Sequence, residues 1–260
     1  MNISLSGKIA VICGSTQGIG LAIAKEFALA GAQCILLARN EASLKEAVAS
    51  LASLGVKHQY YVADFADNKA VKKTIDEILQ SFAVHILVNN TGGPAPGPIT
   101  EASPEAFLLA FQQHIVNYQQ LAQAVLPGMK QVGYGRIINI VSTSVKIPIA
   151  NLGVSNTIRA ATAGWAKTLA NEVAAWGITV NNILPGYTQT QRLDKLISGN
   201  AAKQELNKDE LAGKMQQQIP AKRFGKPEEI AAVAAFLASP AASYVNGVNL
   251  PVDGGSTGAF

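Results

Sequence analysis

Short apolar runs without polar alternation recur along the chain, separated by longer segments of mixed polarity. Runs of this length that are rich in valine and isoleucine are typical of strands buried on both faces of a sheet. The runs occupy residues 9–13, 34–38, 60–63, 84–88, 137–141, 179–184 and 248–252. Between them, apolar residues recur at the spacing of one helical face, which predicts amphipathic helices. Such segments are residues 19–30, 42–54, 69–82, 107–129 and 159–176.

This alternation indicates the fold class. Strands that alternate with helices favour a parallel sheet covered by helices on both faces. No change of composition, long linker or fixed-period repeat divides the chain. We therefore predict one doubly wound α/β domain over residues 1–260, with a parallel sheet of about seven strands.

Residues 189–223 depart from this pattern. The segment is polar, follows the turn at Pro185 and Gly186, and carries more basic than acidic side chains. Two interpretations remain open. It is a solvated surface excursion, or it is a mobile lid over a pocket that prefers acidic substrates.

Composition excludes several classes of protein. Hydrophobic residues make up 48% of the chain and charged residues 15%, against roughly 25% charged in average domains, which excludes a disordered protein. The low charge fits either a large core or surface buried between subunits. The net charge is +4, but the basic residues are scattered, so we expect no nucleic-acid partner.

Cys13 and Cys34 both lie inside apolar runs. Their spacing matches neither a zinc site nor a disulfide framework, so we expect no metal and interpret both as small buried residues in a reducing compartment. Residues 1–8 lack the apolar region of a signal peptide, and no apolar run approaches the roughly 20 residues of a membrane span. The sequence thus predicts a cytoplasmic protein without a membrane partner.

A glycine-rich loop joins the first strand to the first helix. Glycines here allow a tight turn, a close approach of the backbone to a pyrophosphate, and close helix–strand packing. The N-terminus of the helix adds free N–H groups for the phosphates. This context predicts a Rossmann-type dinucleotide site. Its residues are Gly14, Ser15, Thr16, Gln17, Gly18, Ile19 and Gly20.

The end of the second strand bears on which dinucleotide binds. An acidic residue there would accept a hydrogen bond from the ribose 2′-hydroxyl and repel a 2′-phosphate. The sequence instead has Ala38 followed by Arg39, and a guanidinium pairs well with phosphate. We therefore predict NADP(H) rather than NAD(H). The alternative is that Arg39 is merely solvated and NAD(H) is used.

Several motifs together resemble the short-chain dehydrogenase/reductase family over nearly the whole chain. They are the glycine loop, Asn-Asn-Thr-Gly at residues 89–92, the Pro-Gly turn after the sixth strand, and residues 251–255. Their spacing is most similar to the 3-oxoacyl-(acyl-carrier-protein) reductase branch. The resemblance implies that Asp64 contacts the adenine and that residues 185–190 hold the nicotinamide. Besides the loop and Arg39, the cofactor residues that it implies are Asn40, Asp64, Phe65, Asn90, Thr91, Gly92, Arg159, Pro185, Gly186, Thr188 and Thr190.

The catalytic motif that the resemblance implies is missing. In the family a tyrosine donates the proton, and a lysine four residues later on the same helix lowers the tyrosine pKa. None of the six tyrosines here is followed by a lysine at that distance. By register, Ser142 matches the catalytic serine, while Ser155 and Arg159 fall at the tyrosine and lysine positions. His114 falls at the position of the active-site asparagine, and Thr91 replaces the usual alanine.

These substitutions change the available chemistry. Ser155 and Arg159 share one helix face; Arg159 can still bond ribose hydroxyls, although a guanidinium does not deprotonate in proteins. His114 is a candidate general acid, because an imidazole of pKa near 6.5 exchanges protons at neutral pH. The alternative is a buried histidine bonded to a carbonyl. Tyr187 either turns its phenol toward the substrate or lines the pocket, and Tyr118, one turn from His114, is a weaker candidate.

Three functional hypotheses remain open. The first is an NADP(H)-dependent reductase of a small-molecule carbonyl substrate, a 3-oxoacyl thioester or another anionic ketone, with a non-standard proton relay. In it, Ser142 and Ser155 hold the ketone, and His114 or an ordered water supplies the proton. The second is a cofactor-binding protein without dehydrogenase activity, such as a sensor or regulatory partner. The third is other redox chemistry, such as alcohol oxidation or double-bond reduction. The resemblance also implies a homo-oligomer, either a tetramer or a dimer.

Overall fold

Seven parallel strands form one sheet in this computed structural model, which describes residues 2–52 and 55–258. The strands are β1 (Ile9–Cys13), β2 (Gln33–Ala38), β3 (Gln59–Val62), β4 (Ile86–Asn89), β5 (Gly135–Ile140), β6 (Ile178–Pro185) and β7 (Asn249–Val252). Their order is β3-β2-β1-β4-β5-β6-β7. The winding direction reverses between β1 and β4, and sheets of this kind bind ligands at the carboxyl ends of the strands at that point.

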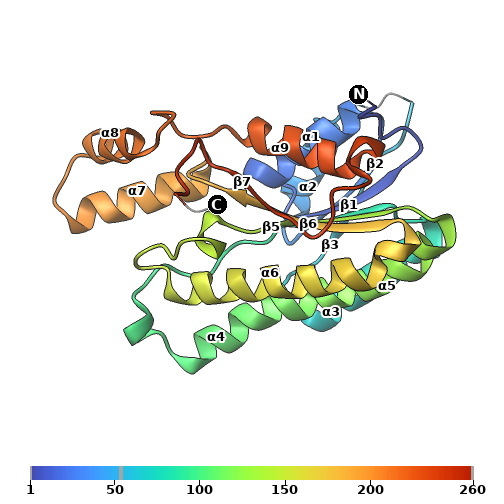
Figure 1. Ribbon diagram of the computed structural model, residues 1–260, viewed down its shortest axis with the longest axis horizontal. Coiled ribbons are helices and arrows are strands. Elements are labelled where there is room, and N and C mark those ends of the chain that lie inside the picture. The colour runs from blue at the N-terminus through green and yellow to red at the C-terminus, as the bar shows by residue number, and fades with distance from the viewer. Residues whose placement is uncertain (1, 53–54, 259–260) are drawn as a thin grey trace.

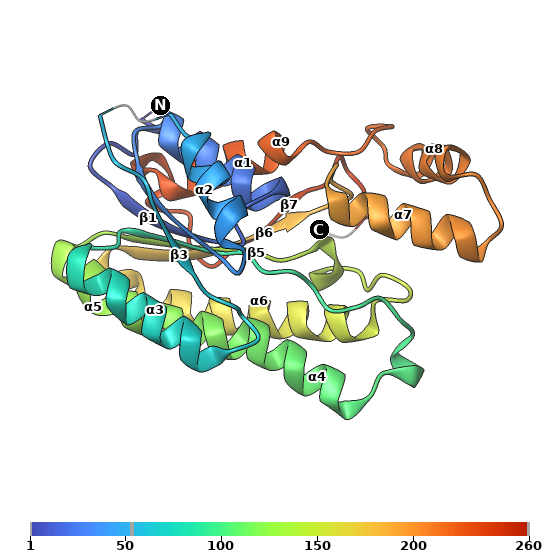
Figure 2. The same cartoon turned by 180° about the vertical axis from the view of Figure 1, so that it is seen from behind.

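Helices cover both faces of the sheet (Figures 1 and 2). On one face they are α1 (Gly18–Leu29), α2 (Glu41–Ala49) and α9 (Pro227–Ala238), and on the other α3 (Asn68–Ser81), α5 (Asn117–Val132) and α6 (Gly153–Val173). Successive strand residues such as Val11 and Ile12 belong to opposite apolar clusters. The strands are therefore buried on both sides, which confirms the predicted fold class. Shorter helical turns lie at Ile99–Glu101, Thr143–Val145, Ala174–Trp176 and Pro240–Ala242.

A row of asparagines crosses half of the sheet. Asn89, Asn139, Asn182 and Asn249 are partners in register on β4, β5, β6 and β7. Each side-chain amide donates to the next side-chain oxygen, at 2.8, 2.8 and 2.7 Å. A shift of register would leave these amides without partners, at a cost of about 1–3 kcal/mol for each buried group. The row thus aligns the strand ends from which the loops of the site start.

The helix predicted over residues 107–129 is divided. α4 (Pro104–Phe111) and α5 are separated by a π-helical turn at Gln112–Val116, which contains His114. The carbonyl oxygen of Gln112 accepts from the N–H of Asn117, five residues further along the chain, and also from Asn68 Nδ2 at 3.3 Å. A π turn inserts a residue without changing the apolar composition, so the hydrophobic pattern did not reveal it.

The helix predicted over residues 42–54 is also shorter than expected. α2 ends at Ala49, and residues 53–54 lie outside the described part of the chain.

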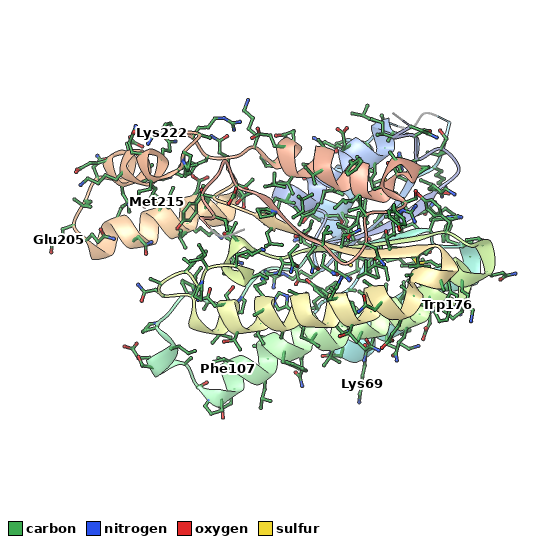
Figure 3. All side chains as sticks on the ribbon, in the orientation of Figure 1. Lys69, Phe107, Trp176, Glu205, Met215 and Lys222 are labelled. Atoms are coloured by element: carbon green, nitrogen blue, oxygen red, sulfur yellow. The ribbon has the colours of Figure 1, made fainter. Side chains whose placement is uncertain are left out.

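Residues 189–223 contain two helices that project beyond the carboxyl edge of the sheet (Figure 1). α7 (Gln191–Lys203) and α8 (Lys208–Gln218) pack on each other through an apolar cluster of their own. Met215 on α8 belongs to this cluster, whereas Glu205 lies in the turn between the two helices (Figure 3). The segment is therefore a small packed unit, and its motion as a lid stays a prediction.

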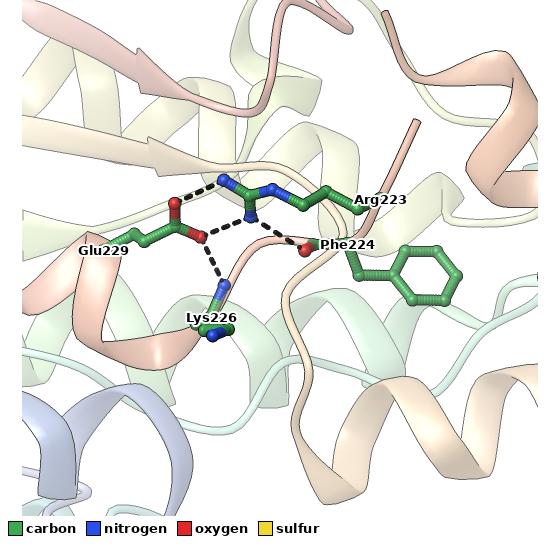
Figure 4. Close-up of polar contacts among 4 residues, drawn as sticks. All are labelled: Arg223, Phe224, Lys226 and Glu229. Atoms are coloured by element: carbon green, nitrogen blue, oxygen red, sulfur yellow. Dashed lines mark hydrogen bonds and ion pairs between the residues drawn. The ribbon is translucent and has the colours of Figure 1, made fainter. Parts of the chain in front are cut away.

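An ion pair anchors the end of this segment to α9. Arg223 donates to both carboxylate oxygens of Glu229, at 2.7 and 2.6 Å, and Glu229 also accepts from the N–H of Lys226 at 2.7 Å (Figure 4). The hydrogen bonds from Arg223 lower the pKa of Glu229 to about 2. The neighbouring Phe224 is buried and packs edge-on against Tyr187, with ring centroids 6.3 Å apart. The anchor thereby holds Phe224 against Tyr187.

Cys13 and Cys34 are free and buried, as predicted. Burial raises the pKa of each thiol to about 12, so neither is a thiolate at neutral pH. Within residues 2–52 and 55–258, no helix is both long and apolar enough to cross a membrane. The same residues contain no cluster of His, Cys, Asp or Glu that could hold a metal ion. The cytoplasmic location stays a prediction.

Candidate active site

The glycine loop after β1 is packed too closely for side chains at two positions. Gly14 has a φ of +57°, and a Cβ there would lie 2.4 Å from the carbonyl oxygen of Asn90. A Cβ at Gly20 would lie 2.1 Å from the carbonyl oxygen of Gly14. The Asn90 side chain donates to the carbonyl oxygens of Cys13 and Gly14 at 3.2 and 3.1 Å. Asn90 thus fastens the end of β4 to the loop.

The loop leads into the N-terminus of α1, whose N-cap residue is Gln17. Gln17 makes no capping hydrogen bond there, whereas Asn40 caps α2 and Asp67 caps α3. Gly18 and Ile19, in the first turn, line a cavity. Free N–H groups and the positive end of the helix dipole suit phosphate oxygens. These residues fit the pyrophosphate of a dinucleotide.

The cavity, of about 990 Å³, lies along the carboxyl ends of the strands. It brings together most of the residues predicted for the cofactor and the reaction. They are Gly14, Thr16, Gln17, Gly18, Ile19, Arg39, Asn40, Asp64, Phe65, Asn90, Thr91, Gly92, Ser142, Ser155, Arg159, Pro185, Gly186, Tyr187, Thr188 and Thr190. Three predicted residues lie behind the cavity wall, namely Ser15, Gly20 and His114.

Ser15 and Gly20 therefore do not line the cavity, and their role in cofactor binding stays a prediction. Ser15 is fully buried, and its hydroxyl donates to the carbonyl oxygen of Leu37 at 3.4 Å, which holds the loop against β2. Gly20 packs against the loop itself. Both residues shape the loop from behind. The sequence did not distinguish them, because inward and outward positions alternate irregularly in a tight turn.

A polar corner lies at the end of β2. Arg39 is exposed, and it makes no ion pair with any described residue. Asn40 accepts from the N–H of Ser43 at 2.9 Å, and Ser43 also lines the cavity. Sequence analysis missed Ser43, although its place in the first turn of a helix after β2 was an available signal. Across the corner, Asp64 accepts from the N–H of Ala66 at 3.0 Å.

Ser142, Ser155 and Arg159 line another part of the cavity. The Ser142 hydroxyl oxygen accepts from the N–H of Ser144 at 3.1 Å, so its own proton is free for another acceptor. Arg159 is 6% exposed and donates to the carbonyl oxygen of Ile140 at 3.0 Å. Burial lowers the pKa of Arg159, and no carboxylate among the described residues pairs with it. A buried cation without a counterion is costly, which favours a ligand as its partner.

Nδ1 of His114 belongs to a hydrogen-bonded group with Thr91 and Tyr118, whereas its buried Nε2 has no partner among the described residues. Its Nδ1 lies 2.8 Å from Thr91 Oγ1 and 3.4 Å from the Tyr118 hydroxyl, and the last two oxygens are 2.9 Å apart. His114 and Tyr118 are fully buried, whereas Thr91 lines the cavity. Thr91 is therefore the member of this group that a ligand can touch.

This environment weighs against the general-acid role predicted for His114, which stays a prediction. Burial lowers the pKa of its imidazole to about 2, and the charges of Arg159 and Arg192 lower it further in the same direction. At neutral pH the ring is uncharged and lies outside the cavity wall, so it does not protonate a substrate directly. The sequence prediction used the value of a free imidazole, because burial and neighbouring cations are tertiary properties.

Tyr187 lines the cavity beyond the end of β6. Burial raises the pKa of its phenol, so the group is a weaker acid than a free tyrosine. Its ring packs on Phe224 in the apolar cluster of α7 and α8. These contacts favour the interpretation that Tyr187 lines the pocket over the one in which it donates a proton.

Arg192, at the start of α7, is a cavity residue that sequence analysis missed. A Cβ on Gly93 would lie 2.5 Å from both Nη1 and Nη2 of Arg192, so the guanidinium rests against Gly93. α7 thus reaches across to the loop after β4. A basic segment and a Gly-Gly pair were visible in the sequence, but neither alone indicates this contact.

Comparison with known proteins shows the family of the chain. The family described as enoyl-(acyl carrier protein) reductase matches residues 14–257. The chain belongs to the short-chain dehydrogenase/reductase family. Among relatives of this short-chain dehydrogenase/reductase, the 3-oxoacyl-(acyl-carrier-protein) reductase FabG of Haemophilus influenzae is 36% identical over 254 residues, which are 96% of this chain and 98% of the relative.

Two further relatives of this short-chain dehydrogenase/reductase extend the comparison. D-beta-hydroxybutyrate dehydrogenase of Cupriavidus necator is 33% identical over 256 residues, 96% of this chain and 98% of the relative. The structure of L-sorbose reductase from Gluconobacter frateurii, complexed with NADPH and L-sorbose, has a TM-score of 0.94 at 35% identity and covers 100% of both chains. These relatives are oxidoreductases, and this short-chain dehydrogenase/reductase is an oxidoreductase as well.

Proposed function

We propose that this oxidoreductase uses NADPH to reduce the carbonyl group of a small molecule. One observation carries the proposal: a single cavity joins the N-terminus of α1 to Ser142, Ser155 and Arg159. The first end suits a dinucleotide and the second suits a polarised carbonyl. The names of the relatives support this reaction, since FabG is a 3-oxoacyl reductase and the sorbose reductase was solved with NADPH.

The polar corner at the end of β2 supports NADP(H) over NAD(H). Arg39 makes no ion pair with a described residue, so its guanidinium is free to bind a 2′-phosphate. Ala38 stands where an acid would favour the unphosphorylated ribose. Ser43 adds a hydroxyl donor to the same part of the cavity wall.

Ser142, Ser155 and Arg159 have different roles in the proposed reaction. When bound, the cofactor supplies a hydride to the carbonyl carbon. The hydroxyls of Ser142 and Ser155 donate hydrogen bonds to the carbonyl oxygen, and the charge of Arg159 stabilises the oxyanion that develops there. A guanidinium does not release its proton at neutral pH, and His114 is buried and uncharged. Water in the cavity therefore passes a proton from bulk solvent to the oxygen, so that no hydroxide stays in the site.

Thr91 serves this relay as a positioning residue. Its hydroxyl is held from behind by His114 and Tyr118, so it presents a fixed orientation to water in the cavity. Arg159 interacts electrostatically with Tyr118, which places the hydrogen-bonded group next to the charge that stabilises the oxyanion. The proton relay in this proposal is therefore a water molecule that Thr91 orients, while His114 and Tyr118 hold the Thr91 hydroxyl in place.

The first test is thermal unfolding of the purified protein with NADPH, with NADH and with neither. A ligand at about 100 times its dissociation constant adds roughly 2.7 kcal/mol of stability. We expect stabilisation by NADPH and much less by NADH, followed by NADPH oxidation with members of a panel of ketones, oxo acids and 3-oxoacyl thioesters. No stabilisation by either dinucleotide would overturn the proposal. Stabilisation without turnover of any carbonyl would favour a sensor or regulatory partner instead.

A further inference from the structure

Two arginines in the cavity wall lack a counterion in the protein. Arg159, on α6, is 6% exposed; it donates to the carbonyl oxygen of Ile140 at 3.0 Å and also interacts with the hydroxyl of Tyr118. Arg192, on α7, is open to the cavity and rests against Gly93. Neither pairs with a carboxylate among the described residues. A guanidinium has several N–H donors in a planar fork, so both side chains keep donors for a ligand.

The two charges act on the same small region. The charge of Arg159 lowers the pKa of Arg192 beyond the effect of burial, and both charges lower the pKa of His114. Both guanidinium groups line the same cavity, and two cations that face one cavity repel each other unless an anion binds there. Protein side chains provide no such anion here, since Asp64 is the acidic residue of the cavity wall. Asp64 follows β3, at the far edge of the sheet from β5 and β6.

The wall beside these arginines is apolar. Ile147 lines the cavity although it is 46% exposed, and Leu196 and Met215 line it from α7 and α8. An exposed apolar side chain such as Ile147 in a concave wall is typical of a surface that a ligand covers. The pocket therefore combines two positive charges, those of Arg159 and Arg192, with an apolar surface.

We propose that Arg159 and Arg192 together bind the carboxylate of an oxo acid whose body is apolar. Ser155 and Arg159 lie one helical turn apart on the same face of α6, so the bound carboxylate lies close to the reacting carbonyl. The substrate class is then a free 2-oxo or 3-oxo acid. A 3-oxoacyl thioester has no charge at that position, which separates this chain from the reaction named for its FabG relatives. The inference rests on the proposed carbonyl reduction at the same site.

The test uses an unreactive pair of probes on the full-length protein saturated with NADP⁺. The probes are 3-phenylpropanoate and its amide, which have the same shape and differ in charge. Calorimetry should show that the carboxylate binds at least tenfold more tightly than the amide, because charge-assisted hydrogen bonds to arginine are lost with the amide. Arg192→Gln should remove this difference. Lys195→Gln is the matched control, since it deletes a positive charge of α7 that does not line the cavity.

The outcomes separate this inference from the proposed function. Equal binding of acid and amide, or an undiminished preference in Arg192→Gln, would overturn the carboxylate site while NADP⁺ binding stands. A parallel loss of NADP⁺ affinity in Arg192→Gln would also overturn it, by assigning Arg192 to the cofactor. If Lys195→Gln weakened the preference for the carboxylate as much as Arg192→Gln does, the preference would come from the overall positive charge of residues 189–223. That result would overturn the specific site. Failure of NADP⁺ itself to bind would instead remove the proposed function.

Discussion

The hydroxyl oxygen of Thr91 lies 2.8 Å from Nδ1 of the buried His114. This contact joins the loop after β4 to the π-helical turn between α4 and α5. Both residues stand at positions where the resemblance leads us to expect others, alanine and asparagine. The two unexpected residues are therefore hydrogen-bonded to each other. In this arrangement the uncharged His114 holds the hydroxyl of Thr91, which lines the cavity.

Thr91→Ala tests that support. The change removes the hydroxyl that lies between His114 and Tyr118, and a buried polar group left unpaired costs about 1–3 kcal/mol. We expect lower stability and a lower kcat with little change in KM, because the substrate is held by other residues. Thr91→Ser, which keeps the hydroxyl, should restore most of both quantities. Equal kcat in the alanine and serine variants would contradict the positioning role.

The pKa of His114 predicts how stability depends on pH. Burial lowers the pKa of the folded imidazole from its ordinary 6.5 to about 2, so below pH 6.5 the unfolded chain binds a proton that the folded chain does not. The contribution of His114 to the free energy of unfolding is therefore fully present above pH 6.5. Below pH 6.5 it falls by about 1.4 kcal/mol per pH unit until the folded pKa is reached. Urea unfolding at pH 7, 6 and 5 should show this slope.

His114→Asn should flatten that slope, because it removes the titrating group while an amide can still bond Thr91. A smaller slope should remain in the variant, since burial also lowers the pKa of His85. An unchanged slope in His114→Asn would show that the imidazole takes up its proton in the folded protein.

Arg39→Ala tests the choice of dinucleotide. Loss of one charge-assisted contact with the 2′-phosphate should weaken NADPH binding by roughly 10- to 100-fold. The affinity for NADH, which lacks that phosphate, should stay the same. Titration of both dinucleotides by fluorescence measures the two constants, and equal weakening of both would place Arg39 outside the phosphate site.

Gly20→Ala tests the close packing of the glycine loop. A Cβ would lie 2.1 Å from the carbonyl oxygen of Gly14, and such overpacking costs about 1–3 kcal/mol. We expect lower thermal stability and loss of NADPH binding. Gly213→Ala in α8 is the matched control, because a Cβ there meets nothing within 4 Å and a helical alanine stabilises by about 0.5–1 kcal/mol. Similar losses in both variants would contradict the packing argument.

The predicted homo-oligomer has a testable surface on α4. Leu108, Leu109 and Phe111 are 65%, 48% and 45% exposed in the single chain. If copies of the chain bury this surface, Leu108→Glu places a charge in the interface, and sedimentation should show smaller particles than the tetramer or dimer of the unaltered protein. Leu29→Glu, at a leucine 63% exposed on α1, should leave the particle size unchanged. The same size in the Leu108 variant would exclude α4 from the interface.

Much of the architecture was predictable because it follows from short-range pattern. β1 has the predicted bounds, since an apolar run between turn residues is sufficient for a strand buried on both faces. The division of the helix around His114 was not predictable, because a π turn leaves the apolar spacing nearly intact. The wall positions of Arg39, Thr91 and Ser142 follow from parallel strands, whose carboxyl ends meet at one edge of the sheet.

Local pattern was thus enough for the order of elements, the glycine loop and the residues that follow each strand. These features depend on periodicity and on the backbone conformations that glycine allows. The inward turn of Ser15, the neutral state of His114 and the contact of Arg192 with Gly93 came from three-dimensional packing alone. Burial and neighbouring charge arise where distant segments meet, and no spacing along a single chain encodes their values.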